Sequence, residues 1–254
     1  MKTIVSLAPS ITETLFAVGA GDRIVGATRY DDWPPEAKKI RRVGGYLDVD
    51  LETIMTLKPD AVFCEQNAGI KNVVSRLAGA GIPVGVVGTT DVASIFTAIE
   101  EVGAAVGRGA AGREKAAGLR AQLDALRKKI AGREPVPVLL FYNVAPLMAA
   151  GKGSFSDEAL AIAGGKNLAG ESPVMYPVYD IEKVAALNPR VIIDQSEETM
   201  GETGLAGEPS PGWKRWPALR AGRDGRVHTV PGGYLFRPGP RIVYSIEMIA
   251  RMLH

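Results

Sequence analysis

The sequence is poor in the residues that most metal sites and disulfides require. Two histidines, His228 and His254, and one cysteine, Cys64, are present among 254 residues. A single cysteine excludes an internal disulfide, and two histidines argue against a histidine-rich zinc or manganese site. A run of about 18 apolar residues, the minimum for a transmembrane helix, is also missing. No membrane span and no metal site are therefore predicted.

The chain also lacks an excess of charge of either sign. Lys and Arg together number 30 against 28 Asp and Glu, which leaves a formal net charge of +2. This balance lacks the strong positive field that binds nucleic acids, so no nucleic-acid partner is predicted. The first residues lack a signal peptide of ordinary length because Pro9 interrupts their apolar stretch. Either the chain is cytoplasmic or a signal has been removed from it.

Short apolar stretches alternate with amphipathic ones along the chain, which is typical of an α/β protein with parallel sheets. Ser10 with Glu13 resembles a capping box, and Asp50, Asp91 and Ser156 stand where helices are expected to begin. The predicted strands are 3–7, 23–27, 61–64, 82–87 and 136–142. The predicted helices are 10–18, 50–57, 72–80, 91–106 and 156–163.

One long amphipathic helix is predicted over residues 111–132. Its apolar residues step by three and four along one face, from Ala116 to Ile130. On the opposite face Arg120 and Asp124 are within reach of each other across one turn. This helix is interpreted either as a strut between two lobes or as an ordinary amphipathic helix packed on a sheet.

A segment of the first half recurs in the second half. Residues 50–62 match residues 180–192 at a constant offset, because 182 − 52 and 189 − 59 both equal 130. Each copy begins with Asp, continues with Glu two residues later, and ends in Leu-x-Pro before a strand. Two copies at this spacing predict two related α/β lobes rather than a solenoid.

The repeat and the long helix together predict three parts: a lobe over 1–107, a linker helix over 108–133 and a lobe over 134–254, with a ligand cleft between the lobes. Loops that follow strands in such folds bind ligands. Here they carry aromatic and apolar residues, which suit a large planar ligand with polar edges. The candidate ligand residues are Tyr30, Trp33, Tyr46, Leu147, Met148, Tyr176, Tyr179, Tyr234, Phe236 and Arg237.

Four stretches of the chain resemble one family. They are residues 4–13, the loop 30–35, the element 50–60 and the late Arg-Pro-Gly-Pro-Arg sequence at 237–241. In order and spacing they are similar to the cluster-A, helical-backbone substrate-binding proteins of ABC importers, and within that family to the corrinoid-binding (cobalamin-binding) members. The resemblance implies two lobes tied by one helix, a monomeric receptor, and a location in the periplasm or anchored outside the cytoplasmic membrane.

The resemblance also implies roles for particular residues. Tyr30, Tyr46 and Tyr176 match aromatic positions that contact the corrin ring. Leu147 or Met148 stands where a phenylalanine lines the pocket, and Arg237 matches an arginine at the polar periphery of the ligand. No cofactor is implied besides the ligand, either cobalamin or cobinamide.

The acidic residue of each repeat copy has an implied role in assembly. Glu52 and Glu182 match the glutamates at the two lobe tips that dock onto arginines of the membrane permease. The alternative interpretation is that each carboxylate only complements the positive end of its own helix, a contribution of about 0.3–1 kcal/mol.

Other ligands and another class of protein remain open. Haem is the main alternative, because a tyrosinate from Tyr30, Tyr46, Tyr176 or Tyr234 can ligate ferric iron. Arg237 and Arg241 are then available for the propionates. A ferric siderophore requires more basic residues than this pair. Cys64 is interpreted as buried and inert. An enzyme is the remaining alternative. It is remote because hydrolysis requires a nucleophile paired with a histidine base, and neither histidine has an evident nucleophile partner.

Overall fold

The computed structural model describes residues 1–45, 48–66, 69–196, 213, 216–230 and 237–254. The chain forms two compact units, one of Met1–Ala121 with Pro238–Pro240 and one of Gln122–Arg237 with Arg241–His254. Each unit has its own sheet flanked by helices, so the predicted α/β class with two related lobes is confirmed. The boundary between the units falls inside helix α5 (Gly109–Ile130). The division at residues 107 and 133 stays a prediction.

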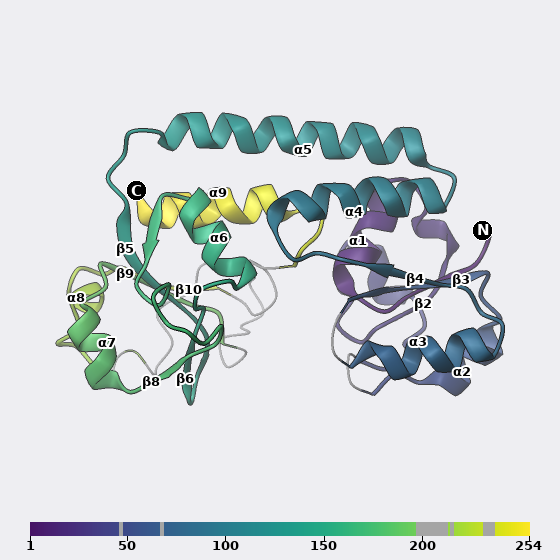
Figure 1. Ribbon diagram of the computed structural model, residues 1–254, viewed down its shortest axis with the longest axis horizontal. Coiled ribbons are helices and arrows are strands. Elements are labelled where there is room, and N and C mark those ends of the chain that lie inside the picture. The colour runs from purple at the N-terminus through teal and green to yellow at the C-terminus, as the bar shows by residue number, and fades with distance from the viewer. Residues whose placement is uncertain (46–47, 67–68, 197–212, 214–215, 231–236) are drawn as a thin grey trace. The chain divides into compact units, whose positions relative to one another are not determined.

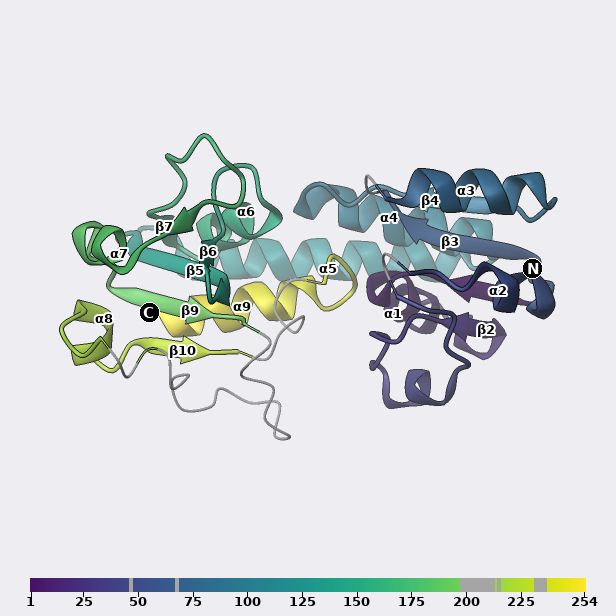
Figure 2. The ribbon, with the colours of Figure 1, turned by 90° about the horizontal axis from the view of Figure 1, so that it is seen from below.

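The first unit contains a four-stranded sheet in the order β2-β1-β3-β4. All three strand pairs are parallel, as predicted, and Figure 2 shows β2, β3 and β4 from below. Its strands are β1 (Ile4–Ser6), β2 (Ile24–Ala27), β3 (Ala61–Glu65) and β4 (Val84–Val87).

Helices cover both faces of this sheet (Figure 1). Helices α1 and α4 lie on one face, and α2 and α3 lie on the other. The second pair packs on a core in which Leu51, Ile54 and Leu77 meet Val62 and Cys64 of β3. The helices are α1 (Pro9–Ala17), α2 (Leu51–Leu57), α3 (Ile70–Gly79) and α4 (Val92–Ala105), with short 3₁₀ turns at Gly21–Arg23 and Pro35–Lys39.

The predicted capping box at Ser10 is wrong. Helix α1 begins one residue earlier, at Pro9, and its N-cap Ala8 has no side-chain hydrogen bond. Proline is well suited to a first helical position because its fixed φ matches the helix and it lacks the N–H that would be unpaired there. The Ser10 hydroxyl instead donates to the Glu65 carboxylate at the end of β3.

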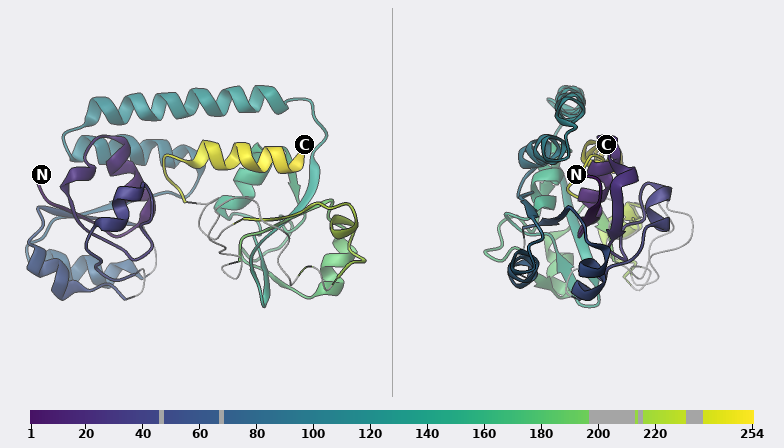
Figure 3. Two further views of the ribbon diagram at one scale, coloured as in Figure 1. Left: turned by 180° about the vertical axis from the view of Figure 1, so that it is seen from behind. Right: turned by 90° about the vertical axis from the view of Figure 1, so that its right-hand side faces the viewer.

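The predicted long helix is confirmed as α5, and its predicted apolar face is buried from Ala116 to Leu126. Its first half lies along α4 (Figure 3). The two helices are so close that a Cβ on Gly112 would stand 3.0 Å from the Ile99 carbonyl oxygen. Arg120 pairs with Glu100 of α4 at 2.5 Å rather than with Asp124. The first half of the helix therefore packs on another helix.

The second unit contains a six-stranded sheet, and here the predicted parallel arrangement is only partly correct. The main order is β10-β9-β5-β6-β8, with β7 also paired to β5. Strand β6 is antiparallel to β5 and to β8, so the expected loop at residues 145–146 is the turn of a hairpin. The strands are β5 (Val136–Val144), β6 (Leu147–Ala149), β7 (Gly165–Asn167), β8 (Val178–Tyr179), β9 (Val191–Asp194) and β10 (Val227–Thr229).

Helix α6 contacts α9 in this unit, while α7 and α8 contribute Val184 and Ala221 to a core with Leu139 and Phe141 of β5. Ser154 rather than Ser156 caps α6, because its hydroxyl accepts the Asp157 N–H at 3.2 Å. These helices are α6 (Phe155–Ile162), α7 (Ile181–Leu187), α8 (Arg220–Arg223) and α9 (Ile242–Leu253).

The sequence repeat corresponds to a structural repeat. Helices α2 and α7 begin at residues 51 and 181, and Asp50 and Asp180 cap them by accepting backbone N–H groups at 2.9 and 2.7 Å. Both helices end on a left-handed residue, Lys58 at φ 46° and Asn188 at φ 49°. Both then lead through proline into the strand that pairs with the first strand of their sheet, β3 with β1 and β9 with β5.

Candidate functional site

The carboxyl ends of the parallel strands position the predicted ligand residues of the first unit. The loop after β2 carries Tyr30 and Trp33, whose side chains are 41% and 45% exposed. Both rings are therefore exposed at the edge of the sheet where open α/β folds bind ligands, and their ligand roles stay predictions.

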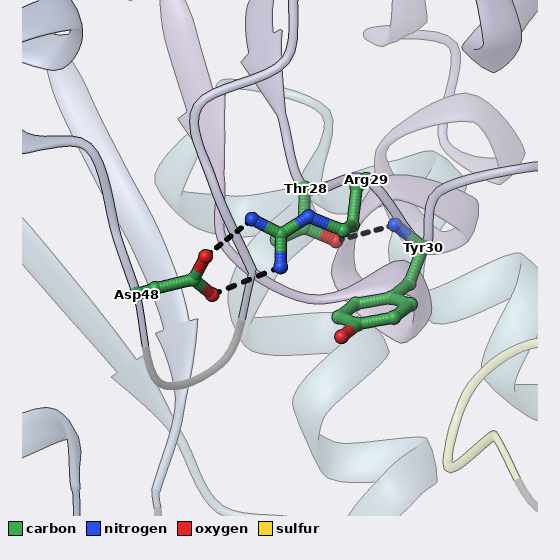
Figure 4. Close-up of polar contacts among 4 residues, drawn as sticks. All are labelled: Thr28, Arg29, Tyr30 and Asp48. Carbon is green, nitrogen blue, oxygen red and sulfur yellow. Dashed lines mark hydrogen bonds and ion pairs between the residues drawn. The ribbon is translucent and has the colours of Figure 1, made fainter.

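The Tyr30 ring is supported by an ion pair (Figure 4). The Arg29 guanidinium lies over the ring, 5.8 Å from its centroid, and forms two hydrogen bonds with the Asp48 carboxylate, one of them 3.0 Å long. The hydrogen bond from Arg29 lowers the pKa of Asp48, and the carboxylate in turn raises the pKa of Arg29. A planar guanidinium held in this way restricts where the ring can lie.

The backbone of the same loop is held by Arg42, which donates to the carbonyl oxygens of Thr28 and Asp31 at 2.9 and 3.0 Å. The Thr28 hydroxyl donates to the Asp31 carboxylate and accepts the Tyr30 N–H at 3.3 Å. These contacts hold the backbone of the loop on both sides of Tyr30.

Glu65 is a buried acid at the same edge that the sequence did not single out. It ends β3 and accepts a hydrogen bond from Ser10 of α1. Burial raises its pKa, the Ser10 hydrogen bond lowers it, and the nearby Asp31 charge raises it, so that the pKa lies above its usual value. The position had one sequence signal, a charged residue directly after four apolar strand residues.

We expect the substitution Glu65→Gln to remove a pH dependence of stability. The unfolded chain titrates this glutamate near its ordinary pKa of about 4.3. Between that pH and the raised pKa, the folded chain holds a proton that the unfolded chain has lost, so stability falls as the pH rises. Urea denaturation from about pH 4 to pH 8 measures this fall, and the exposed Glu101→Gln is the control. A variant that loses stability with pH as steeply as the wild type contradicts the prediction.

The second unit presents an apolar segment just before β8. Val174, Met175, Tyr176 and Val178 are each between 45% and 59% exposed. Their backbone is held by Gly151, whose N–H donates to the Met175 carbonyl oxygen at 2.8 Å. A Cβ at Gly151 would stand only 2.5 Å from the Val174 carbonyl oxygen, so this approach requires glycine.

Tyr176 packs edge-on against Tyr142 of β5, with ring centroids 5.6 Å apart and an interplanar angle of 73°. The Tyr142 hydroxyl is hydrogen-bonded to Ser156, and burial raises its pKa to about 12. Tyr142 is therefore protonated at neutral pH and unsuited to be a tyrosinate ligand. Tyr176 is the exposed member of the pair.

Leu147 and Met148, the two candidates on β6 for lining the ligand pocket, differ in burial. Leu147 is 6% exposed and belongs to the core that contains Trp213, so its side chain is occupied by packing. Met148 points to the other side of its strand and is partly exposed. Burial thus favours Met148 as the ligand contact, and that role stays a prediction.

The remaining predicted ligand residues are placed only in part. Tyr46, Tyr234 and Phe236 lie outside the described residues. Arg237 and Arg241 are both partly exposed and both make polar interactions. Tyr179 is partly buried against the core of the second unit, and burial raises its pKa. The ligand roles of these residues stay predictions.

Glu52 and Glu182 occupy equivalent positions, each the second residue of a seven-residue helix. Both side chains are exposed, and neither carboxylate is hydrogen-bonded or ion-paired within the described part of the chain. The structure therefore leaves both carboxylates available to a partner.

Cys64 is fully buried in the core of the first unit, and burial raises the pKa of its thiol to about 11, so the thiol is inert as expected. Within the described ranges, no group of three or more His, Cys, Asp or Glu side chains is placed to hold a metal ion. None of the helices in those ranges is both long and apolar enough to cross a membrane.

A cavity of about 410 Å³ lies in the second unit beside the second half of α5. It is lined by Gln122, Leu126 and Lys129 of α5 and by Val243, Tyr244 and Glu247 of α9. None of the predicted ligand residues that the structure describes lines it.

Comparison with known proteins places the chain among solute-binding proteins. The sequence profile of the family described as periplasmic binding protein matches residues 4–228. A vitamin B12-binding protein of Vibrio cholerae is 28% identical over 99% of this chain and 89% of its own length. The crystal structure of the periplasmic vitamin B12 binding protein of that organism superimposes with a TM-score of 0.85, covering 99% of this chain and 96% of that one.

Two further similar proteins are not named as vitamin B12-binding proteins. The uncharacterized ABC transporter substrate-binding lipoprotein YvrC of Bacillus subtilis is 30% identical over 100% of this chain and 80% of its own length. The periplasmic heme-binding protein RhuT of Roseiflexus sp. RS-1, in apo form, is 26% identical with a TM-score of 0.87 and covers 99% of this chain and 97% of that one. Proteins similar to this chain are thus named for binding vitamin B12 and for binding heme.

Proposed function

Because the chain belongs to the periplasmic binding protein family, we propose that it is the substrate-binding protein of an ABC importer and that it captures a corrinoid, cobalamin or cobinamide. Binding is non-covalent, and the ligand is passed to a permease in the cytoplasmic membrane. The protein acts as a monomer in the periplasm or anchored outside that membrane, with no nucleic-acid partner. The family consists of solute-binding proteins rather than enzymes, and no catalytic residue is proposed.

One observation carries the ligand assignment. Each unit presents exposed aromatic side chains on a loop whose backbone is held in place, Tyr30 and Trp33 in one and Tyr176 in the other. Flat aromatic faces suit a macrocycle, while their polar tips and Arg237 suit its polar edge. The similarity to the vitamin B12-binding protein of Vibrio cholerae supports a corrin ring as that macrocycle.

We assign docking onto the permease to α2 and α7. The two helices share their caps, their length and the exposed Glu at the second position. Equivalent tips on two related units match what a permease with two-fold symmetry presents. Glu52 and Glu182 then pair with basic residues of the permease.

A fluorescence-quench titration of the purified protein with cyanocobalamin and cobinamide tests the ligand. We expect saturable quenching with a Kd below about 1 µM, equivalent to about 8 kcal/mol of binding free energy. The absence of saturable quenching with both corrinoids contradicts the proposal.

Haem is the second candidate, favoured by the similarity to the heme-binding protein of Roseiflexus. Tyr30 or Tyr176 then supplies a tyrosinate to ferric iron, while Arg237 and Arg241 pair with the propionates. A haemin absorbance titration run in parallel decides between the two. A ligated tyrosinate spectrum without any corrinoid response assigns haem to this chain.

A further inference from the structure

The repeat that relates α2 to α7 extends to the ends of the strands that follow them. At the same offset of 130 residues, Glu65 of β3 corresponds to Gln195, which directly follows β9. The Gln195 N–H donates to the Phe141 carbonyl oxygen at 2.8 Å and so continues the ladder between β9 and β5. Both residues therefore stand at the carboxyl end of a parallel strand, the edge that binds ligands in open α/β sheets.

The two side chains differ in whether the fold satisfies them. The Glu65 carboxylate accepts the Ser10 hydroxyl. The Gln195 side chain is only 7% exposed, and its Oε1 is buried without a hydrogen-bond partner among the described residues. A buried amide oxygen without a partner costs free energy, so such a group in a native protein requires an explanation.

The direction of the Gln195 side chain follows from the register of the sheet. Phe141 pairs with Asp194 in the sheet, and both residues contact Trp213. The ring centroids of Phe141 and Trp213 are 5.2 Å apart, and the Trp213 indole N–H donates to the Asp194 carboxylate at 2.8 Å. Successive strand residues point to opposite faces. Gln195 therefore lies on the other face, beside Tyr142.

That face is where the candidate ligand contact of this unit is held. Tyr142 is bonded there to Ser156 of α6, and its ring contacts the exposed ring of Tyr176. The unsatisfied Oε1 of Gln195 thus belongs to a side chain on the same face of the sheet as Tyr142, the residue that supports a predicted stacking surface.

A carboxamide both donates and accepts hydrogen bonds. A carboxamide on a ligand satisfies the Gln195 Oε1, because its N–H donates to that oxygen while its own oxygen accepts from the Gln195 amide. A ligand carboxylate only accepts, so it leaves Oε1 unpaired and also loses hydration of its charge. Because Gln195 is so little exposed, a slender arm at the edge of the ligand reaches it, whereas the face of the macrocycle does not.

We propose that Gln195 hydrogen-bonds a peripheral carboxamide of the bound ligand and thereby selects amide-bearing macrocycles over carboxylate-bearing ones. This inference rests on the proposed function, whose ligand class it makes specific. Corrinoids carry such amide arms, whereas haem carries carboxylates.

The variant Gln195→Met tests the proposal because it keeps the length of the side chain and removes both hydrogen-bonding groups. The probes are dicyanocobinamide, with amide arms, and dicyanocobyrinic acid, with carboxylates on the same ring. We expect the variant to bind dicyanocobinamide about tenfold more weakly and dicyanocobyrinic acid within about twofold of the wild type. The exposed Gln122→Met of α5 is the control and leaves both affinities unchanged.

Thermal unfolding without ligand separates this role from a structural one. Removing an unsatisfied buried amide stabilises the fold, so we expect the Tm of Gln195→Met to rise by about 2 to 4 °C. A Tm that falls instead shows that the amide is satisfied in the free protein and overturns the proposal. An equal loss of affinity for both probes, or no loss for dicyanocobinamide, also overturns it.

The absence of binding of both probes to the wild-type chain is a separate outcome. That result overturns the proposed corrinoid function, and the role of Gln195 is overturned with it. Saturable dicyanocobinamide binding by the wild type with no effect of Gln195→Met overturns the inference alone.

Discussion

The double variant Glu52→Lys with Glu182→Lys is expected to lose corrinoid uptake while it keeps the ligand affinity of the wild type. Both carboxylates are exposed and unpaired within the described residues, so reversing their charge leaves the packing of each unit intact. At a permease surface lined by basic residues, the same change replaces two attractions by two repulsions, each worth several kcal/mol when like charges meet at an interface. Uptake into vesicles that carry the cognate permease measures the loss.

The matched control reverses two other exposed glutamates, Glu101→Lys with Glu134→Lys, one in each unit. This control changes the net charge equally and is expected to support normal uptake. Equal uptake by the two double variants would show that α2 and α7 do not dock. Weaker ligand binding by the Glu52 and Glu182 variant would place these helices in the ligand site instead.

Tyr176→Ala is expected to weaken corrinoid binding by about 2 kcal/mol, or roughly thirtyfold in Kd. Its ring is 48% exposed and rests edge-on against Tyr142, so it offers a positioned aromatic face that alanine removes. Isothermal titration with cyanocobalamin measures the change.

Two further tyrosine variants interpret this result. Tyr244→Ala removes a ring that is 50% exposed on α9 but has no predicted ligand role, so its affinity is expected to stay at the wild-type value. Tyr176→Phe keeps the stacking face and is expected to retain corrinoid binding. If the true ligand is haem held by the Tyr176 tyrosinate, the phenylalanine variant loses the ligated spectrum as completely as alanine does. Unchanged affinity in Tyr176→Ala removes this residue from the site.

Local patterns in the sequence were sufficient for much of the fold. The spacing of apolar residues identified α5, and the Asp caps located α2 and α4, because both signals depend only on neighbours along the chain. The segment of α7 was found through its match to residues 50–62. The repeat was also detectable from the sequence, because both copies keep the Asp cap, the Glu two residues later and the Leu-x-Pro ending.

The features that local patterns got wrong, left open or missed depend on contacts between distant segments. Ser10 looked like a cap but donates to Glu65, 55 residues away. Leu147 and Met148 are equivalent in the sequence, but the hairpin of β5 and β6 places Leu147 in the core and leaves Met148 partly exposed. Gln195 was missed because nothing in its immediate sequence distinguishes it. Only the register of β9 against β5 shows which face it occupies.

The burial of Cys64 makes the chain convenient for site-specific labelling. With a pKa of about 11, only about one thiol in ten thousand is ionised at pH 7, and the side chain is fully buried, so reagents in solution do not reach the sulfur. An introduced cysteine is then the sole thiol that a maleimide dye can reach, with the native residue left in place. At Val178, which is 59% exposed and two residues from Tyr176, such a dye would report ligand capture as a change in its emission.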